Sequence, residues 1–140
     1  MSDNSPNNWN QQIIDEFHAN GGKVGGPFAE MNLLLLTTTG AKSGRQYTNP
    51  VAYNTYGDRL VVFATKSGAP TNPDWYHNLV ANPEVTVELG TETFKARAVP
   101  LTGEDRDRAY QKQADEVPQF ATYPEKTTRV IPVIALDRLD

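Results

Sequence analysis

Cysteine is absent from this chain of 140 residues, and so is any long hydrophobic run. Because there is no thiol, disulfides, thiolate catalysis and cysteine-bound metals are excluded, and we expect no metal site. The longest uncharged apolar stretch, LLLLTTT, is far shorter than the about 20 residues that cross a bilayer. The first thirty residues also lack the apolar segment of a secretory signal. These absences predict a cytoplasmic protein.

Basic residues are outnumbered by acidic ones, 13 to 17, which leaves a net charge of −4. Nucleic-acid binding needs a basic face, so this balance argues against a nucleic-acid partner. The positive charge is nevertheless concentrated in residues 40–70, where the local charge is +3. The charged residues of that segment are Lys42, Arg45, Arg59, Lys66 and Asp58. A local cluster of this kind indicates a small anionic ligand.

Length and composition are those of one globular domain. Residues 1–30 are expected to form an N-terminal helix and lead-in, and residues 31–140 the main domain. In the N-terminal segment Trp9, Ile13 and Phe17 recur every four residues, as one stripe of a helix over 8–20 that the following glycines end. We expect this helix to pack across one end of the core, and the sequence leaves open whether it also associates with a membrane.

The rest of the chain is dominated by strand patterns. The candidate strands are 33–39, 46–54, 60–65, 84–89, 92–99 and 130–136. Short connections such as GAKSG and NTYGD predict an antiparallel meander, and six strands of this kind curl into a small barrel. Pro132 predicts that the last strand is an edge strand or carries a bulge. The expected fold class is mainly β, a six-stranded antiparallel split β-barrel with peripheral helices.

Two helices interrupt the strands. The first is expected to start with Asn72 as its N-cap, Pro73 at the first helical position and Asp74 against the helix dipole, and to end at residues 82–83.

The second helix, over 102–117, is expected to start with Thr102 as its cap, paired with Asp105 in a variant capping box. It sets Tyr110, Ala114 and Val117 on one face.

Two loops share the triplet KSG. In a meander the connections after the first and third strands leave the sheet at the same rim, so GAKSGR and TKSGAPTNPDW are expected to be neighbours. Their cations and hydroxyls, with glycines and free amides at a helix start, suit a phosphate or carboxylate. The residues concerned are Lys42, Ser43, Gly44, Arg45, Lys66 and Ser67. The alternative is that both loops are ordinary solvated turns.

Aromatic and small residues near the same rim could hold a planar ring. They are Tyr47, Tyr53, Phe63, Ala64, Trp75 and Tyr76. A flat heteroaromatic cofactor with an anionic tail would match both groups of residues. The competing interpretation places Phe63 in the core and turns Trp75, with Leu79 one helical turn on, toward the barrel.

Other chemistries find little support in the sequence. His18 and His77 lie on different predicted helices and are interpreted as surface or packing residues. The motifs G-x-S-x-G, G-x-x-x-x-G-K-[ST] and G-x-G-x-x-G do not occur. With no evident nucleophile or base, we expect no catalytic side chain, and hydride transfer from a cofactor demands least of the protein.

Three segments carry a resemblance to a known family: LLLLTTTGAKSGRQYTNPVAY, LVVFATKSGAPTNPDWYHNLVANPEVTVEL and FKARAV. They resemble the deazaflavin-dependent nitroreductase family of actinobacteria, small split-barrel proteins that bind coenzyme F420. The resemblance implies an oxidoreductase that passes a hydride from the reduced coenzyme to an electron-poor organic acceptor, a quinone or a nitroaromatic. A separate F420-reducing dehydrogenase would regenerate the coenzyme.

The resemblance also implies site residues. Lys42, Ser43 and Lys66 would meet the phosphate and polyglutamate tail. The residues that would line or support the deazaflavin are Asn49, Pro50, Ala64, Thr65, Trp75 and Tyr76. The full candidate set adds Gly44, Arg45, Tyr47, Thr48, Phe63, Ser67 and Asn78.

Two departures from the family pattern bear on the site. Many relatives carry an arginine where this chain has Tyr47. In relatives that reduce nitro groups, tyrosines before the last strand cover the substrate, and here Phe120 and Tyr123 are the candidate substrate contacts. A second hypothesis keeps the barrel but binds FMN, or serves as a ligand carrier without catalysis. The sequence leaves both a monomer and a homodimer open.

Overall fold

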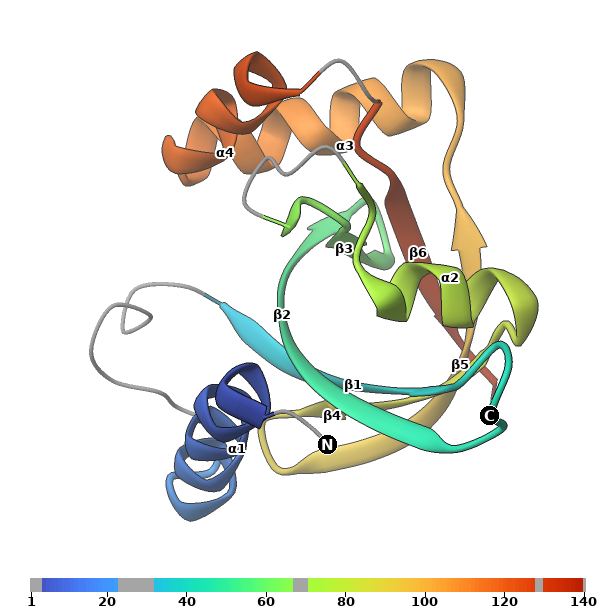
Figure 1. Cartoon of the computed structure of the whole chain (residues 1–140). Coiled ribbons are helices and arrows are strands. Elements are labelled where there is room, and N and C mark those ends of the chain that lie inside the picture. The colour runs from blue at the N-terminus through green and yellow to red at the C-terminus, as the bar shows by residue number, and fades with distance from the viewer. Residues whose placement is uncertain (1–3, 23–31, 67–70, 128–129, 140) are drawn as a thin grey trace.

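Six antiparallel strands close into a barrel in the computed structural model, which describes residues 4–22, 32–66, 71–127 and 130–139 (Figure 1). The strands are β1 (Leu33–Thr39), β2 (Gln46–Tyr56), β3 (Arg59–Phe63), β4 (Glu84–Leu89), β5 (Glu92–Pro100) and β6 (Val133–Arg138). Their order around the barrel is β1-β2-β3-β6-β5-β4, with β4 hydrogen-bonded back to β1. The first three strands form the predicted meander, and the predicted fold class is confirmed.

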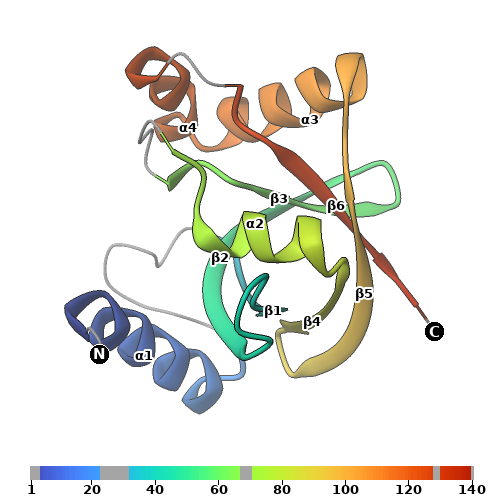
Figure 2. The ribbon, with the colours of Figure 1, turned by 45° about the vertical axis from the view of Figure 1, so that its right-hand side comes forward.

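Helices surround the barrel on several sides. They are α1 (Asn4–Ala19), α2 (Asp74–Ala81), α3 (Gly103–Glu116), α4 (Gln119–Thr122) and the 3-10 turn η3 (Tyr123–Lys126). Figure 2 shows α2 lying across one end of the barrel, with α1 and the α3–α4 pair on different sides of it. Within the described residues, none of the helices combines the length and apolar character needed to span a membrane.

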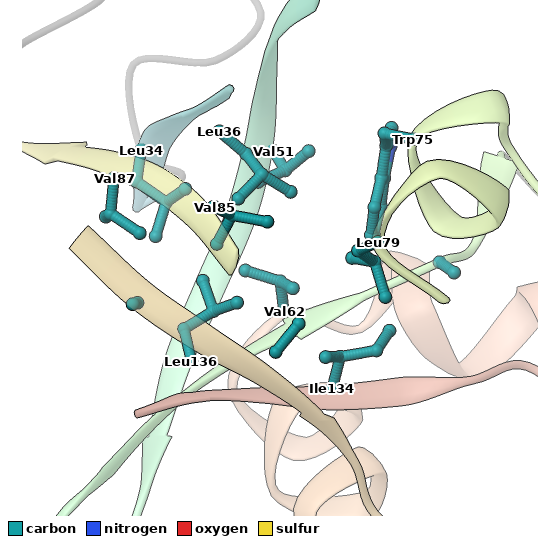
Figure 3. Close-up of a cluster of buried hydrophobic side chains, with 13 residues drawn as sticks. Leu34, Leu36, Val51, Val62, Trp75, Leu79, Val85, Val87, Ile134 and Leu136 are labelled. Atoms are coloured by element: carbon teal, nitrogen blue, oxygen red, sulfur yellow. The ribbon is translucent and has the colours of Figure 1, made fainter. Parts of the chain in front are cut away.

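The barrel interior is filled by alternate side chains of the strands, because successive residues of a strand point to opposite faces. Leu34, Leu36, Val62 and Ile134 meet inside (Figure 3), and each is fully buried. Trp75 and Leu79 of α2 close one end of this core, one helical turn apart. The interpretation that turned Trp75 toward the barrel is therefore confirmed.

A second apolar cluster lies between the outer face of β3 and β6 and the helices α3, α4 and η3. Val61, Phe63 and Val133 point outward into it, opposite in phase to Val62 and Ile134. Tyr110 and Ala114 supply the buried face of α3, with Val117 packed against them, as the spacing predicts. Phe63 therefore belongs to the core, which was the competing interpretation of its role.

The helix starts differ from the predictions. α2 begins at Asp74 with Pro73 in the N-cap position, so the assignment of Asn72 as N-cap is wrong by one residue. Thr102 is the N-cap of α3, as predicted, but no side-chain capping bond forms. The capping-box prediction for Asp105 is wrong because its carboxylate instead accepts a hydrogen bond from the Tyr56 hydroxyl, at 3.1 Å.

The prediction for Pro132 is also wrong. β6 begins after this proline and pairs with both β3 and β5, so it is not an edge strand. Its pairing with both neighbours runs residue for residue, so it carries no bulge either. Pro132 still takes part in the barrel, because its carbonyl accepts the Ala64 N–H at 3.0 Å. Proline lacks a backbone N–H but keeps its carbonyl, so it can fill a position that only accepts a hydrogen bond.

Polar contacts tie the outer elements to the barrel. Asn54 donates to Gln113 Oε1 at 2.9 Å and to Glu116 Oε1 at 3.1 Å, which fixes α3 against β2. Arg59 makes a two-pronged bond to Asp137 that joins β3 to β6, and this hydrogen bonding raises the pKa of the guanidinium.

Helix α1 packs against β2 and is tied to β4. Ile13 and Phe17 are buried as predicted, while the Trp9 side chain lies outside the described part of the structure. His18 Nε2 lies 2.7 Å from Glu88 Oε1. The helix ends as expected at two glycines with positive φ, and a Cβ on Gly22 would lie 2.5 Å from the Gly90 Cα. This close approach explains why glycine follows the helix.

Candidate functional site

A pocket of about 920 Å³ opens between α1, the turn that joins β1 to β2, and α2. Its lining residues are Gln11, Ile14, Gly40, Ala41, Lys42, Ser43, Tyr47, Thr48, Asn49, Asp74, Trp75, His77 and Asn78. The volume lies within the range of about 300–1,000 Å³ typical of small-molecule and cofactor sites.

The turn of residues 40–45 holds its shape through its own hydrogen bonds. The Gly40 N–H donates to the Arg45 carbonyl at 2.6 Å, and the Gly44 N–H, at a residue with φ of +72°, donates to the Gly40 carbonyl at 3.1 Å. Ser43 Oγ accepts the Arg45 N–H at 3.2 Å and lies 3.1 Å from the Tyr47 hydroxyl. The turn is therefore a fixed platform that leaves Lys42 exposed at the pocket.

Asn78 joins α2 to this platform. Its Oδ1 accepts the Ala41 N–H at 3.1 Å, and its Nδ2 donates to Thr38 Oγ1 at 3.2 Å. Both ends of the amide are thus engaged within the protein. Asn78 lines the pocket, as its place among the candidate residues anticipated, and its contacts give it a positioning role there.

Seven of the sequence-predicted residues meet in this pocket. They are Lys42, Ser43, Tyr47, Thr48, Asn49, Trp75 and Asn78. Gly44 and Arg45 form the closing half of the turn without lining the pocket. Pro50, Ala64, Thr65 and Tyr76 also lie outside the lining set, and Tyr76 and Tyr53 each pack against the barrel core.

The second KSG loop is placed only in part. Lys66 adopts a left-handed backbone with φ of +47°, and its Nζ donates to Thr71 Oγ1 at 3.1 Å. It is not among the lining residues, and Ser67 lies outside the described residues. The first loop does meet the start of the helix that follows the second loop, so the shared rim is confirmed between residues 40–43 and α2.

Phe120 and Tyr123 lie in the second cluster and not in this pocket. The centroid of the Phe120 ring lies 5.8 Å from that of the Phe63 ring and 5.2 Å from that of the Tyr123 ring, and both ring pairs meet edge-on. The Tyr110 hydroxyl donates to the Phe120 carbonyl at 2.7 Å. Both residues are about 5 % exposed or less, so contact of either with a substrate stays a prediction.

Six lining residues were not among the predicted site residues. Gly40 and Ala41 belong to the predicted loop GAKSGR, and the other four, Gln11, Ile14, Asp74 and His77, were missed altogether. A signal for two of them was present, because Asp74, His77 and Asn78 are spaced by three and four and so share one face of α2. For Gln11 and Ile14 no local signal existed, since only the docking of α1 brings them to the pocket.

The lining chemistry fits an anionic aromatic cofactor. Lys42 supplies a cation, and Ser43, Tyr47 and Thr48 supply hydroxyls. Trp75, 8 % exposed, supplies a flat apolar wall at the boundary between the pocket and the barrel core. Polar groups at one wall and an aromatic ring at another are what such a group requires.

Gly40 offers a test of the platform. A Cβ at this position would lie 2.6 Å from Ser43 Oγ and 2.9 Å from Tyr47 Cε2. We expect Gly40→Ala to displace both side chains and to lower the free energy of unfolding by about 1–3 kcal/mol, measured by urea denaturation.

Gly57→Ala is the matched control at the β2–β3 turn. A Cβ at Gly57 meets nothing within 4 Å, but φ is +62°, so the cost of this substitution comes from the backbone alone. Ligand binding weakened in Gly40→Ala but not in Gly57→Ala would support the platform, and equal binding in both would contradict it.

The chain matches the F420H(2)-dependent quinone reductase family over residues 9–138. It belongs to that family. It is 39% identical over 108 residues to the F420H(2)-dependent quinone reductase of Mycobacterium tuberculosis strain H37Rv, covering 75% of this chain and 72% of the relative. A second protein of that strain, a putative F420H(2)-dependent quinone reductase, is 34% identical over 103 residues, covering 74% and 87%.

Solved structures agree with the family assignment. An F420-H2 dependent reductase, FDR-A, superposes with a TM-score of 0.68 at 36% identity, covering 75% of this chain and 93% of that one. A structure described as a domain-swapped dimer has a TM-score of 0.70 at 30% identity, covering 95% and 100%. The putative pyridoxamine 5'-phosphate oxidase of Listeria innocua, at 11% identity and a TM-score of 0.55, covering 94% of each chain, shares the fold alone.

The family membership confirms the resemblance from which the cofactor was predicted. The chain is an oxidoreductase of the F420H(2)-dependent quinone reductase family, and coenzyme F420 is the cofactor that the family implies. Of the two predicted acceptor classes, quinones are the one in the family description.

Proposed function

We propose that this protein reduces quinones with reduced coenzyme F420 held in the pocket between α1, the turn of residues 40–45 and α2. One observation carries the proposal: a single pocket joins the exposed Lys42 and Ser43 of a fixed turn to the aromatic wall of Trp75. A molecule with an anionic tail and a flat ring can contact both at once.

Each wall has a distinct task in this proposal. Lys42 and the Ser43 hydroxyl bind the phosphate and carboxylates of the tail, because charge-assisted hydrogen bonds are the strongest available there. Thr48 and Asn49 offer hydrogen bonds to the polar edge of the ring, and Trp75 packs on its apolar surface. The predicted contact of Lys66 with the tail stays part of the proposal. Lys66 donates to Thr71, which lies three residues before α2, and the first turn of α2 lines the pocket.

The protein's part in the reaction is to position the reactants. When bound, the reduced coenzyme supplies a hydride, so a quinone gains two electrons and, with one proton, becomes a hydroquinone. Trp75 is anchored in the barrel core beside Leu79, and Asn78 fixes α2 to the turn. A wall anchored in this way holds a bound ring at a constant distance from an acceptor.

The proposal is tested by titrating the protein with oxidised coenzyme F420 and, in parallel, with FMN, following fluorescence. We expect binding of the deazaflavin and, in a second assay, oxidation of the reduced coenzyme by a soluble naphthoquinone. Binding of FMN alone would favour a flavoprotein. Binding of neither would favour a carrier for another ligand, and either result would overturn the proposal.

Turnover consumes reduced coenzyme, so the proposal includes a separate F420-reducing dehydrogenase that regenerates it. Cytoplasmic location with peripheral membrane contact through α1, and assembly as a monomer or homodimer, complete the proposal. Sedimentation with lipid vesicles would measure the membrane contact, and sedimentation without them would measure the assembly state.

A further inference from the structure

His77 lines the pocket but has no role in the function proposed above. Of the lining residues that the structure describes, it is the one whose side-chain type ordinarily exchanges a proton near neutral pH. It shares the pocket-facing side of α2 with Asp74 and Asn78, and the bonds of Asn78 to Thr38 and Ala41 fix that side toward the turn. The His77 side chain is solvent-exposed, so protons reach it freely.

The charges around His77 nearly cancel. The other titratable side chains of the pocket lining are Lys42 of the turn, Tyr47 of β2 and Asp74 of α2. The Tyr76 ring packs against that of His77, with 5.7 Å between the ring centroids. The lining residues from α1, Gln11 and Ile14, carry no charge. At neutral pH the positive charge of Lys42 is balanced by the negative charge of Asp74. The proton of His77 therefore decides whether the lining of the pocket carries a net positive charge.

We propose that His77 is the proton-responsive cation of this pocket, and that binding of the anionic coenzyme draws a proton onto its imidazole. This inference rests on the proposed function, because it needs an anion in the pocket. An anion next to the ring favours the imidazolium, and by reciprocity the imidazolium favours the anion. Affinity for the coenzyme should therefore fall as the pH rises and His77 loses its proton.

The test is the dissociation constant of oxidised coenzyme F420 measured by fluorescence between about pH 5 and 8, the range in which histidine titrates. The coenzyme has ionisable groups of its own, so the comparison is between the wild type and His77→Gln, which share them. We expect the wild type to lose about two- to fivefold more affinity than the variant across this range, as an exposed ion pair allows. Calorimetry in two buffers of different ionisation heat should show more proton uptake on binding to the wild type than on binding to His77→Gln.

Two further variants sharpen the comparison. His77→Lys keeps a positive charge at every pH of the range. It should show the same pH profile as His77→Gln, but with an affinity near that of the wild type at low pH. His18→Gln removes the only other histidine of the sequence, which lies outside the pocket against Glu88, and should keep the wild-type profile.

Identical pH profiles for the wild type and His77→Gln would overturn the inference while leaving the coenzyme site intact. A difference between the two pH profiles that appears only in the turnover rate, and not in the dissociation constant, would also overturn it and would assign His77 to the acceptor. Failure of all proteins to bind the coenzyme at any pH would instead overturn the proposed function.

Discussion

Replacing Lys42 with alanine is expected to weaken the binding of oxidised coenzyme F420 by about 10- to 100-fold, the range that a hydrogen bond to a charged group supports. Lys42 is the permanent cation among the described lining residues, and its turn is held in place whether or not its side chain is present. The loss is therefore one of attraction and not of shape. Fluorescence titration measures it.

Two controls separate charge from general effects. Lys42→Arg keeps the charge and should recover most of the affinity. Lys95→Ala removes an exposed cation of β5 that does not line the pocket, and it should bind as the wild type does. The wild type should also lose affinity with added salt more steeply than Lys42→Ala. Unchanged affinity in Lys42→Ala would show that the tail is bound elsewhere.

Replacing Phe120 with alanine is expected to lower the free energy of unfolding by about 3–5 kcal/mol, as large-to-small changes of a buried aromatic residue do. The ring is 3 % exposed and packs edge-on against Phe63 and Tyr123, between α4 and the outer face of the barrel. Its removal leaves a cavity beneath α4 that these neighbours fill only in part. Urea denaturation followed by circular dichroism measures the change.

This variant also separates a packing role for Phe120 from the substrate contact that the family resemblance implies. Phe120→Leu keeps most of the volume and should cost less stability than alanine, with KM for a quinone unchanged if the role is packing. A raised KM with near-normal stability would instead support contact with the substrate. Ala121→Ser, at the exposed neighbouring position, should change the free energy of unfolding by no more than about 0.5 kcal/mol.

The strands were predictable from the sequence because each is specified locally. β1 and β4 have the predicted bounds, since their apolar runs and flanking turn residues lie within a few positions of one another. Predictions that depended on a partner were less successful. Pro132 signals an edge strand only when the barrel is open, and closure gives β6 a neighbour on each side.

The candidate site divides in the same way. Lys42, Ser43 and Asn78 could be named from short motifs, and they do line one pocket. Phe63 was also named as a site residue from its position in the sequence, but its side chain faces α3 and α4. Successive residues of a strand point to opposite faces, and only the register decides which face points inward. No pattern within residues 40–78 could reveal that α1 lines the pocket.

The amino-acid sequence was enough to predict a small antiparallel barrel, a concentration of positive charge in one segment and a resemblance to a deazaflavin-dependent family. These properties follow from local periodicity, turn residues and short motifs, which need no knowledge of distant contacts. The folded structure was needed to show that Ile14 and His77 share a pocket with Lys42, and that Phe120 is buried apart from it. Pocket walls come from elements far apart in the chain, and they meet only when barrel closure and helix docking together bury apolar surface.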